Sequence, residues 1–126
     1  MNKTENKYDL EERLISYSVL VIELIEKLPQ NKATSHLGNQ LLRSSTSPAL
    51  NYGEMQAAES RRDFIHKMKI VLKELRESYN CLRILEKAGF LDNKNAMNET
   101  NELISIFVKS LDTAIRNSRT KQEFKS

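Results

Sequence analysis

Several residue types are scarce in this chain of 126 residues, which has one cysteine, three glycines, two prolines and no tryptophan. The single cysteine, Cys81, excludes an internal disulfide framework and suits a reducing compartment. The glycines are isolated at positions 38, 53 and 89, so no glycine-rich loop is available to bind phosphate. Because glycine and proline are few, long stretches of the chain are free to form helices.

Long apolar runs are also missing. The most apolar segment, residues 19–25, is short and contains Glu23, whereas a membrane span needs about 20 apolar residues. The first ten residues lack the apolar core of a secretory signal. We therefore expect a cytoplasmic protein without a membrane span. Residues 1–126 are enough for one domain that folds without disulfides or metal.

Apolar residues at alternating spacings of four and three predict four long helices. The clearest core seam, in residues 61–88, consists of Phe64, Met68, Val71, Leu75, Ser78, Leu82 and Leu85. Similar patterns predict helices at about 9–28, 33–59 and 93–119. In the last helix the expected seam is Met97, Asn101, Ile104, Val108, Leu111 and Ile115, broadened by Leu103 and Phe107. Four such helices with short loops predict an all-α, antiparallel up-down-up-down four-helix bundle.

Capping and breaking residues set the expected helix ends. Ser60 with Asp63 predicts a capping box at the start of the third helix, and Gly89 predicts a Schellman stop at its end. Pro29 should end the first helix, while Pro48 should either kink the second helix or break it. The polar ends, residues 1–7 and 120–126, are expected to be loose.

The outer face of the 61–88 helix carries positive charge and no acid. Its positions, again spaced by four and three, hold Arg62, His66, Lys69, Lys73, Arg76, Asn80, Arg83 and Lys87. A solvated face usually mixes both signs, so this pattern also indicates a surface for a polyanion such as RNA or DNA. We name its candidate phosphate contacts the basic stripe: Arg62, Lys69, Lys73, Arg76, Arg83 and Lys87. No aromatic residue lies among them, so base stacking is not expected there.

The first helix is apolar on two opposite faces. Its outer positions carry Ile15, Val19 and Ile22, where a bundle monomer would place charge. Large aliphatic side chains at helical spacing on an exposed face are typical of an interface. We expect these residues to mediate contact between copies of the chain.

A polar row lies along the second helix at Arg43, Ser47, Asn51 and Glu54. It could contact a ligand or RNA, or it could be a hydrogen-bonded row that joins this helix to the third through a carboxylate such as Glu74. Catalytic and metal-binding patterns are not found. A di-iron bundle needs two Glu-x-x-His motifs, whereas Asp63 and His66 show a related spacing only once. We predict no enzymatic activity, cofactor or metal.

Residues 40–47, Asn51, Glu54, and segments 58–61 and 63–69 resemble a bacterial family of four-helix bundles, the 23S ribosomal RNA intervening-sequence proteins. The positions that match the family motif are Arg43, Ser47, Asn51, Glu54, Ser60, Phe64 and Glu74. The resemblance implies a ring-shaped homopentamer and transfers no catalytic residue. It also implies a relation to the accessory protein of diversity-generating retroelements, which binds reverse transcriptase and nucleic acid through basic surface.

Two positions depart from the family pattern: Pro48 directly follows Ser47, and Gly53 replaces a larger residue before Glu54. Neither change threatens the bundle. We expect a non-enzymatic homo-oligomer, a pentamer by resemblance, that binds RNA or another polyanion through the basic stripe. The alternative is an oligomeric scaffold or adaptor for a protein partner such as a reverse transcriptase, without direct contact to nucleic acid.

Overall fold

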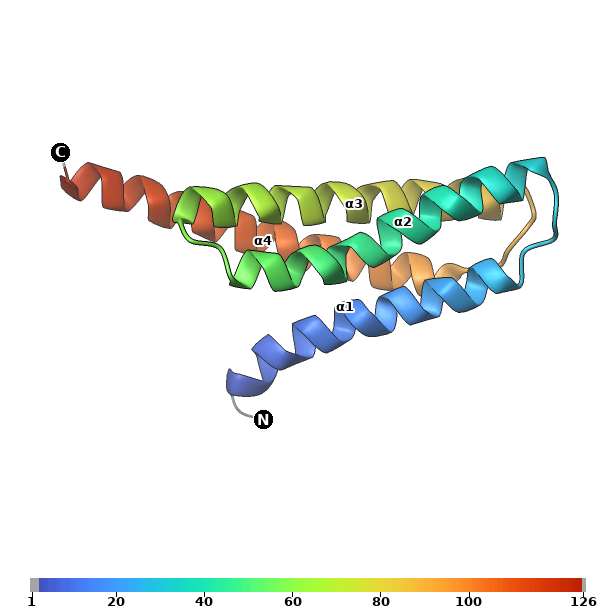
Figure 1. The fold of residues 1–126 in the computed structure, drawn as a ribbon, viewed down its shortest axis with the longest axis horizontal. Coiled ribbons are helices and arrows are strands. Elements are labelled where there is room, and N and C mark those ends of the chain that lie inside the picture. The colour runs from blue at the N-terminus through green and yellow to red at the C-terminus, as the bar shows by residue number, and fades with distance from the viewer. Residues whose placement is uncertain (1–2, 126) are drawn as a thin grey trace.

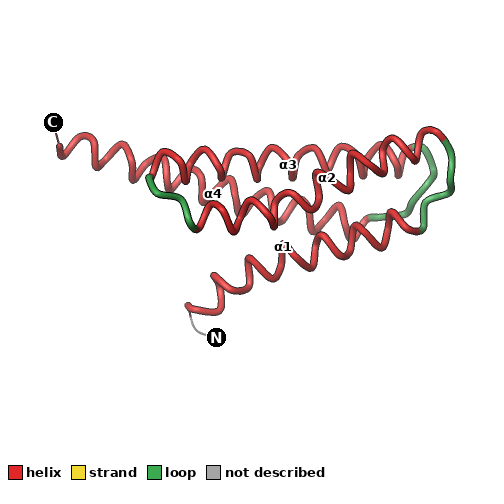
Figure 2. The backbone as a smooth tube through the Cα atoms, viewed as in Figure 1, coloured by secondary structure: helices red, strands yellow, loops and turns green. Residues whose placement is uncertain are grey.

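The computed structural model describes the backbone of residues 3–125 and the side chains of residues 10–119. It contains four helices, α1 (Lys3–Glu26), α2 (Lys32–Gln56), α3 (Arg61–Lys87) and α4 (Lys94–Lys125), and the described backbone has no strand. Figure 1 shows the helices along one long axis, with their connections at alternate ends of the molecule. Figure 2 shows that these connections are short. The all-helical prediction is confirmed.

Each helix packs on its neighbours in the chain, and α1 also contacts α4. The N-terminal end of α1 diverges from the other helices in Figure 1. No helix in the described part of the chain is both long and apolar enough to cross a membrane.

The terminal helices are longer than their sequence patterns predicted. Helix α1 begins at Lys3 rather than near Asp9, and α4 continues to Lys125 rather than ending near Arg119. The end segments contain no glycine or proline to stop a helix, and several of their residues, such as Lys and Gln, have high helix propensity. Polarity alone was therefore a poor sign of a loose end. The expectation for residues 1, 2 and 126 lies outside the described residues.

The end of α2 also differs from the prediction, which placed it at Glu59. The helix ends at Gln56, after which Ala57 and Ala58 donate to carbonyls three residues back, at 3.1 and 3.2 Å. Ser60 then adopts an extended backbone with φ −140°, because it caps α3 by accepting a hydrogen bond from the Asp63 amide. An extended cap residue cannot also be helical, so the two helices need a linker.

The proline and glycine signals have different outcomes. Helix α2 continues through Pro48, whose side chain is fully buried, so the alternative of a helix break is wrong. Gly89 has φ +81° and directly follows the α3 cap residue. The amide of Phe90 donates to the Leu85 carbonyl at 3.0 Å, and the Gly89 amide donates to the Glu86 carbonyl at 3.0 Å. These are the two bonds of a Schellman motif, which is confirmed.

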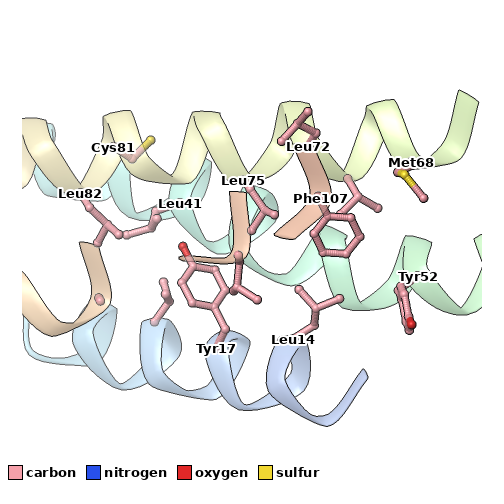
Figure 3. Close-up of a cluster of buried hydrophobic side chains, with 14 of the residues drawn as sticks. Leu14, Tyr17, Leu41, Tyr52, Met68, Leu72, Leu75, Cys81, Leu82 and Phe107 are labelled. Atoms are coloured by element: carbon pink, nitrogen blue, oxygen red, sulfur yellow. The ribbon is translucent and has the colours of Figure 1, made fainter. Parts of the chain in front are cut away.

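The core is built from the predicted inner faces of α1 and α3. Leu14, Tyr17 and Val21 of α1 are fully buried or nearly so, as are Val71 and Leu75 of α3. Figure 3 shows the α1 side chains reaching into the space below α3. Burying one leucine or valine side chain contributes about 1.5–3 kcal/mol, so this apolar contact is a main source of stability.

The core seam of α4 is not the predicted one. The buried residues of this helix are Ala96, Thr100, Leu103, Phe107 and Ala114. Asn101 and Val108 of the predicted seam are exposed, and its other members are only partly buried. The apolar residues of α4 form two adjacent stripes, one containing Ile104 and Val108 and the other Leu103 and Phe107. Hydrophobic periodicity alone does not show which stripe faces the core. The small side chains of Ala96 and Ala114 permit close helix approach, and Thr100 finds a polar partner inside the bundle.

A layer of hydroxyl groups crosses the apolar core with one residue from each helix. Ser78 of α3 donates to the Ser44 hydroxyl of α2 at 2.9 Å, and the Tyr17 hydroxyl of α1 lies 2.7 Å from Thr100 Oγ1 of α4. All four side chains are buried. Burial raises the pKa of the Tyr17 phenol, while hydrogen bonding with Thr100 and Ser78 partly opposes this increase. These four buried hydroxyl groups thus find their partners within the bundle.

Candidate nucleic-acid interface

The basic stripe lies on the face of α3 opposite its core seam. Every one of its residues is exposed, as are His66 and Asn80 on the same face. The helix spans Arg61–Lys87 without interruption. At 1.5 Å per residue, the stripe from Arg62 to Lys87 is about 37 Å long. The structure therefore presents the predicted cations to solvent along one line.

Two acids in the middle of α3, Glu74 and Glu77, pair with Arg43 of α2. Arg43 Nη1 lies 2.9 Å from Glu74 Oε2, and Arg43 Nη2 contacts Glu77 Oε2. The charge of Glu74, with that of Glu77, raises the pKa of the Arg43 guanidinium. Because Arg43 binds both carboxylates, they do not pair with the basic stripe. The stripe keeps a single sign of charge.

No ion pair joins the basic stripe to any side chain within residues 10–119. Arg83 is placed over the Tyr79 ring, with its guanidinium carbon 6.0 Å from the ring centroid. This is within the range of a cation–π contact, which leaves the charge exposed to solvent. Lys67, which lies outside the stripe, instead pairs with Glu54 at 3.5 Å. The stripe cations are available for a partner.

The first turns of α3 border a hollow against α4. It has a volume of about 340 Å³ and is lined by Arg62, Ile65, His66, Lys69 and Ser118. Two stripe cations thus face a concave surface next to a hydroxyl-bearing residue of α4. Concave positive surface concentrates electric field and attracts anions more strongly than flat surface.

The polar row of α2 makes contacts within the bundle. Asn51 Nδ2 donates to the carbonyl and hydroxyl oxygens of Ser47, at 3.0 and 2.8 Å. Arg43 and Glu54 pair with α3 through Glu74 and Lys67. The sequence analysis named Glu74 as a carboxylate that could join this row to α3, and the Arg43–Glu74 pair is present in the structure. Of the other motif positions, Ser60 caps α3 and Phe64 packs against the core. A ligand-binding role for the row stays an open prediction.

The outer aliphatic residues of α1 are exposed. The exposed fractions are 43% for Ile15, 48% for Val19 and 36% for Ile22. Nearby, the Ser18 hydroxyl donates to the Ser45 carbonyl of α2 at 3.0 Å. Residues three or four apart share a helix face, so Ile15 and Ile22 flank Ser18, and Leu42, which is 42% exposed, flanks Ser45. We call Ile15, Val19, Ile22 and Leu42 the apolar patch.

The sequence did not indicate two features of this surface. Leu42 is one of the few large apolar residues of α2, and only the packing of α2 on α1 indicates that it extends the apolar patch. The other feature is an ion-pair cluster between α1 and α4. Arg13 donates to Glu99 from Nε at 2.8 Å and from Nη2 at 2.7 Å, and Nη2 also contacts Glu102 at 2.7 Å. No local pattern could identify partners 86 residues apart.

The cluster fixes the charge of its members. The hydrogen bond from Arg13 is the largest effect on Glu99 and lowers the pKa of its carboxyl group, although partial burial opposes this. Hydrogen bonding to Glu99 also raises the pKa of Arg13. Both groups are therefore charged at neutral pH and join α1 to α4.

Reactive groups are not gathered into a site in the described part of the chain. Cys81 is buried, and burial raises the pKa of its thiol, which makes it a poor nucleophile. His66 is exposed on the outer face of α3. Among the described residues, no three His, Cys, Asp or Glu side chains are close enough to hold a metal ion together.

Comparison with known proteins agrees with the predicted resemblance. The family described as 23S rRNA-intervening sequence protein matches residues 6–111 of the chain. One similar solved structure is a protein of unknown function from the S23 ribosomal protein family of Bacteroides thetaiotaomicron. Its TM-score is 0.75 at 26% sequence identity, and the match covers 81% of this chain and 97% of that chain. No curated protein is significantly similar to this sequence.

The family match covers the polar row, the basic stripe and most of the four helices, and the predicted resemblance is confirmed. The chain belongs to the 23S rRNA-intervening sequence protein family.

Proposed function

We propose that this protein binds RNA through the basic stripe of α3 and does not catalyse a reaction. The observation that carries the proposal is a line of exposed cations without ion-pair partners among the described side chains. The family name refers to 23S rRNA, which supports RNA as the polyanion. The protein would act in the cytoplasm, where a single thiol such as Cys81 stays reduced.

Binding would occur by neutralisation of phosphates and release of their counterions. The stripe, about 37 Å long, corresponds to roughly 11 base steps at 3.4 Å per step. Because Tyr79 packs beside Arg83 rather than projecting from the line of cations, recognition would depend on charge and backbone shape. Phosphate contacts position a protein on nucleic acid but do not read its sequence.

The proposal includes assembly of the chain with copies of itself. The connections at alternate ends support an antiparallel up-down-up-down bundle as the subunit. The apolar patch would be buried against a neighbouring copy, since exposed aliphatic residues that adjoin one another mark interfaces. A closed ring, a pentamer by resemblance, would repeat the basic stripe around its circumference. Several weak stripes acting together would bind RNA far more tightly than one.

The test is RNA binding by the full-length protein across a salt series. The affected variant combines Lys69→Glu, Lys73→Glu and Arg76→Glu. The matched control combines Lys27→Glu, Lys32→Glu and Lys94→Glu, which changes the net charge equally at exposed positions outside α3. For single-stranded RNA, log affinity should fall with log salt by about 0.7 per neutralised phosphate.

The stripe variant should lose most of its affinity, and its salt slope should be smaller by at least about 2 because three phosphate contacts are removed. The control should keep the slope of the unmodified protein. Equal losses in both variants would mean that net charge, rather than the stripe, governs binding. Absence of binding at low salt would reject the RNA proposal. Both variants need unchanged circular dichroism and mass for the comparison.

Assembly is tested separately by light scattering. Ile15→Lys with Ile22→Lys should give a folded species of smaller mass, because two charges would enter the buried interface. Ser16→Lys with Glu23→Gln changes net charge equally on exposed positions of the same helix and should not change the mass. An unchanged mass in the first variant would refute the role of the apolar patch.

The second candidate is a scaffold or adaptor for a protein partner such as a reverse transcriptase. The specific observation that favours it is the apolar patch, which would suit a protein surface rather than RNA. In that case the variant Ile15→Lys with Ile22→Lys would no longer bind the partner, although its own mass in light scattering would be unchanged. The stripe variant would bind RNA no differently from the unmodified protein.

A further inference from the structure

A cavity opens between the four helices at the end where α1 diverges. Its volume is about 410 Å³, and each helix contributes to its lining. Tyr52 and Met55 of α2, Met68 of α3 and Phe107 of α4 form its inner wall and are almost fully buried. Figure 3 shows Phe107, Met68 and Tyr52 at the same end of the core. The Tyr52 and Phe107 rings meet edge to face, with centroids 6.2 Å apart.

The rim of the cavity is positively charged. Arg61 at the start of α3 and Lys109 of α4 line it and are exposed. Neither has an ion-pair partner within residues 10–119. The other polar lining residues within residues 10–119 are neutral, so no carboxylate of this part of the chain contributes to the wall. Burial is the main cause that raises the pKa of the Tyr52 phenol, and the charge of Glu11, an exposed residue of α1, adds to the increase.

We propose that this cavity binds an amphipathic monocarboxylate. The apolar tail would occupy the space between Met55, Met68 and Phe107, and the carboxylate would lie at the rim between Arg61 and Lys109. The volume falls in the range of small-molecule sites, about 300–1,000 Å³, which are mainly apolar with a few placed polar groups. Charge complementarity favours an anion, since the described lining residues include two cations and no acid. The cavity is lined by no residue of the basic stripe. Ligand binding in the cavity can therefore be tested independently of RNA binding.

The experiment uses the full-length protein with 13C-methyl methionine and dodecanoate as the probe, below its micelle concentration. Met55 and Met68 line the cavity, while Met97, near the start of α4, does not and serves as an internal control. Saturable shifts of the Met55 and Met68 methyl resonances are expected, with Met97 unchanged. Dodecanol, which has the same tail without charge, should bind more weakly.

Two variants test the two halves of the site. Arg61→Gln with Lys109→Gln should weaken dodecanoate binding by about tenfold or more, the loss expected for a charge-assisted hydrogen bond. The control, Lys32→Gln with Lys94→Gln, removes the same charge at exposed positions of the opposite end. Ala114→Leu should also weaken binding by filling the cavity, whereas Ala57→Leu, an exposed residue after α2, should not.

Four results would overturn the proposal. The Met55 and Met68 resonances could stay unchanged when dodecanoate is added, which would mean that it does not enter the cavity. The Met97 resonance could shift equally, which would indicate non-specific binding. Dodecanol could bind as tightly as dodecanoate, which would remove the role of the cations. The two resonances could also shift with protein concentration alone, which would mean that a second copy of the chain covers the cavity. The salt-series RNA experiment gives a separate readout for the proposed function.

Discussion

The phenol of Tyr17 on α1 and the hydroxyl of Thr100 on α4 lie 2.7 Å apart inside the core. Thr100 donates its single proton to the Ala96 carbonyl at 2.7 Å, so Tyr17 is the donor between the two residues. Ser78 of α3 donates its single proton to the Ser44 hydroxyl of α2 at 2.9 Å, which joins the other two helices at the same level. A shift of α1 by one turn would separate the Tyr17 phenol from Thr100 and leave a buried donor without this partner. The hydrogen bond therefore favours one register of α1 against α4.

Removal of the phenol hydroxyl tests this layer. Tyr17→Phe should lower the free energy of unfolding by about 1–2 kcal/mol, because a buried hydrogen bond is lost while the ring remains. Urea unfolding monitored by circular dichroism measures the change. Tyr79→Phe is the control, since Tyr79 is only half-buried and packs beside Arg83. If the two variants were equally stable, the layer would have no special role.

The Arg13–Glu99 contact should make stability depend on acid pH. Its hydrogen bond lowers the pKa of Glu99 in the folded state, so the stabilisation is present above the ordinary value of 4.5 and is lost as pH falls through the lower folded value. Glu99→Gln should reduce stability at neutral pH and flatten the loss below pH 4.5. Glu26→Gln, which removes an exposed acid of α1, should keep the pH profile of the unmodified protein. Urea midpoints measured at several pH values check this prediction. It would be wrong if Glu99→Gln lost as much stability at acid pH as the unmodified protein does.

Two glycines should respond oppositely to alanine. Gly89 has φ +81°, where a Cβ costs about 1–2 kcal/mol, so Gly89→Ala should destabilise the protein. Gly53 lies inside α2, and no neighbouring side chain or helix comes within 4 Å of the position that a Cβ would take there. Gly53→Ala should therefore stabilise the protein by about 0.5–1 kcal/mol. Thermal unfolding of both variants checks the signs. A stabilised Gly89→Ala would contradict the Schellman geometry.

Arg43→Met distinguishes the two interpretations of the polar row. If the row is structural, the substitution should lower the urea midpoint, because Glu74 and Glu77 lose the partner that joins α2 to α3. The salt slope of RNA binding should be unchanged, because no phosphate contact is removed, whereas Lys73→Met should reduce both affinity and slope without changing stability. Selective loss of RNA binding in Arg43→Met at unchanged stability would favour the ligand-binding interpretation.

Local interactions explain why much of the fold was readable from the sequence. The seam of α3, the cap at Ser60 and the Schellman motif at Gly89 depend on residues within one or two turns, and each is present in the structure. The exposure of the basic stripe follows directly, since a helix with one buried face presents the opposite face to solvent. The candidate phosphate contacts could be chosen for that reason.

Contacts between helices decided the rest. Periodicity left two apolar stripes on α4, and only packing showed that Leu103 and Phe107, rather than Val108, lie inside. The Arg13–Glu99 pair and the Tyr17–Thr100 hydrogen bond join residues more than 80 positions apart, and the cavity at the open end needs all four helices. The sequence by itself determined where helices form and which charges face outward, because neighbours along the chain control both. The tertiary structure alone decided register, partners and cavities, because these depend on side chains that meet only after the helices pack.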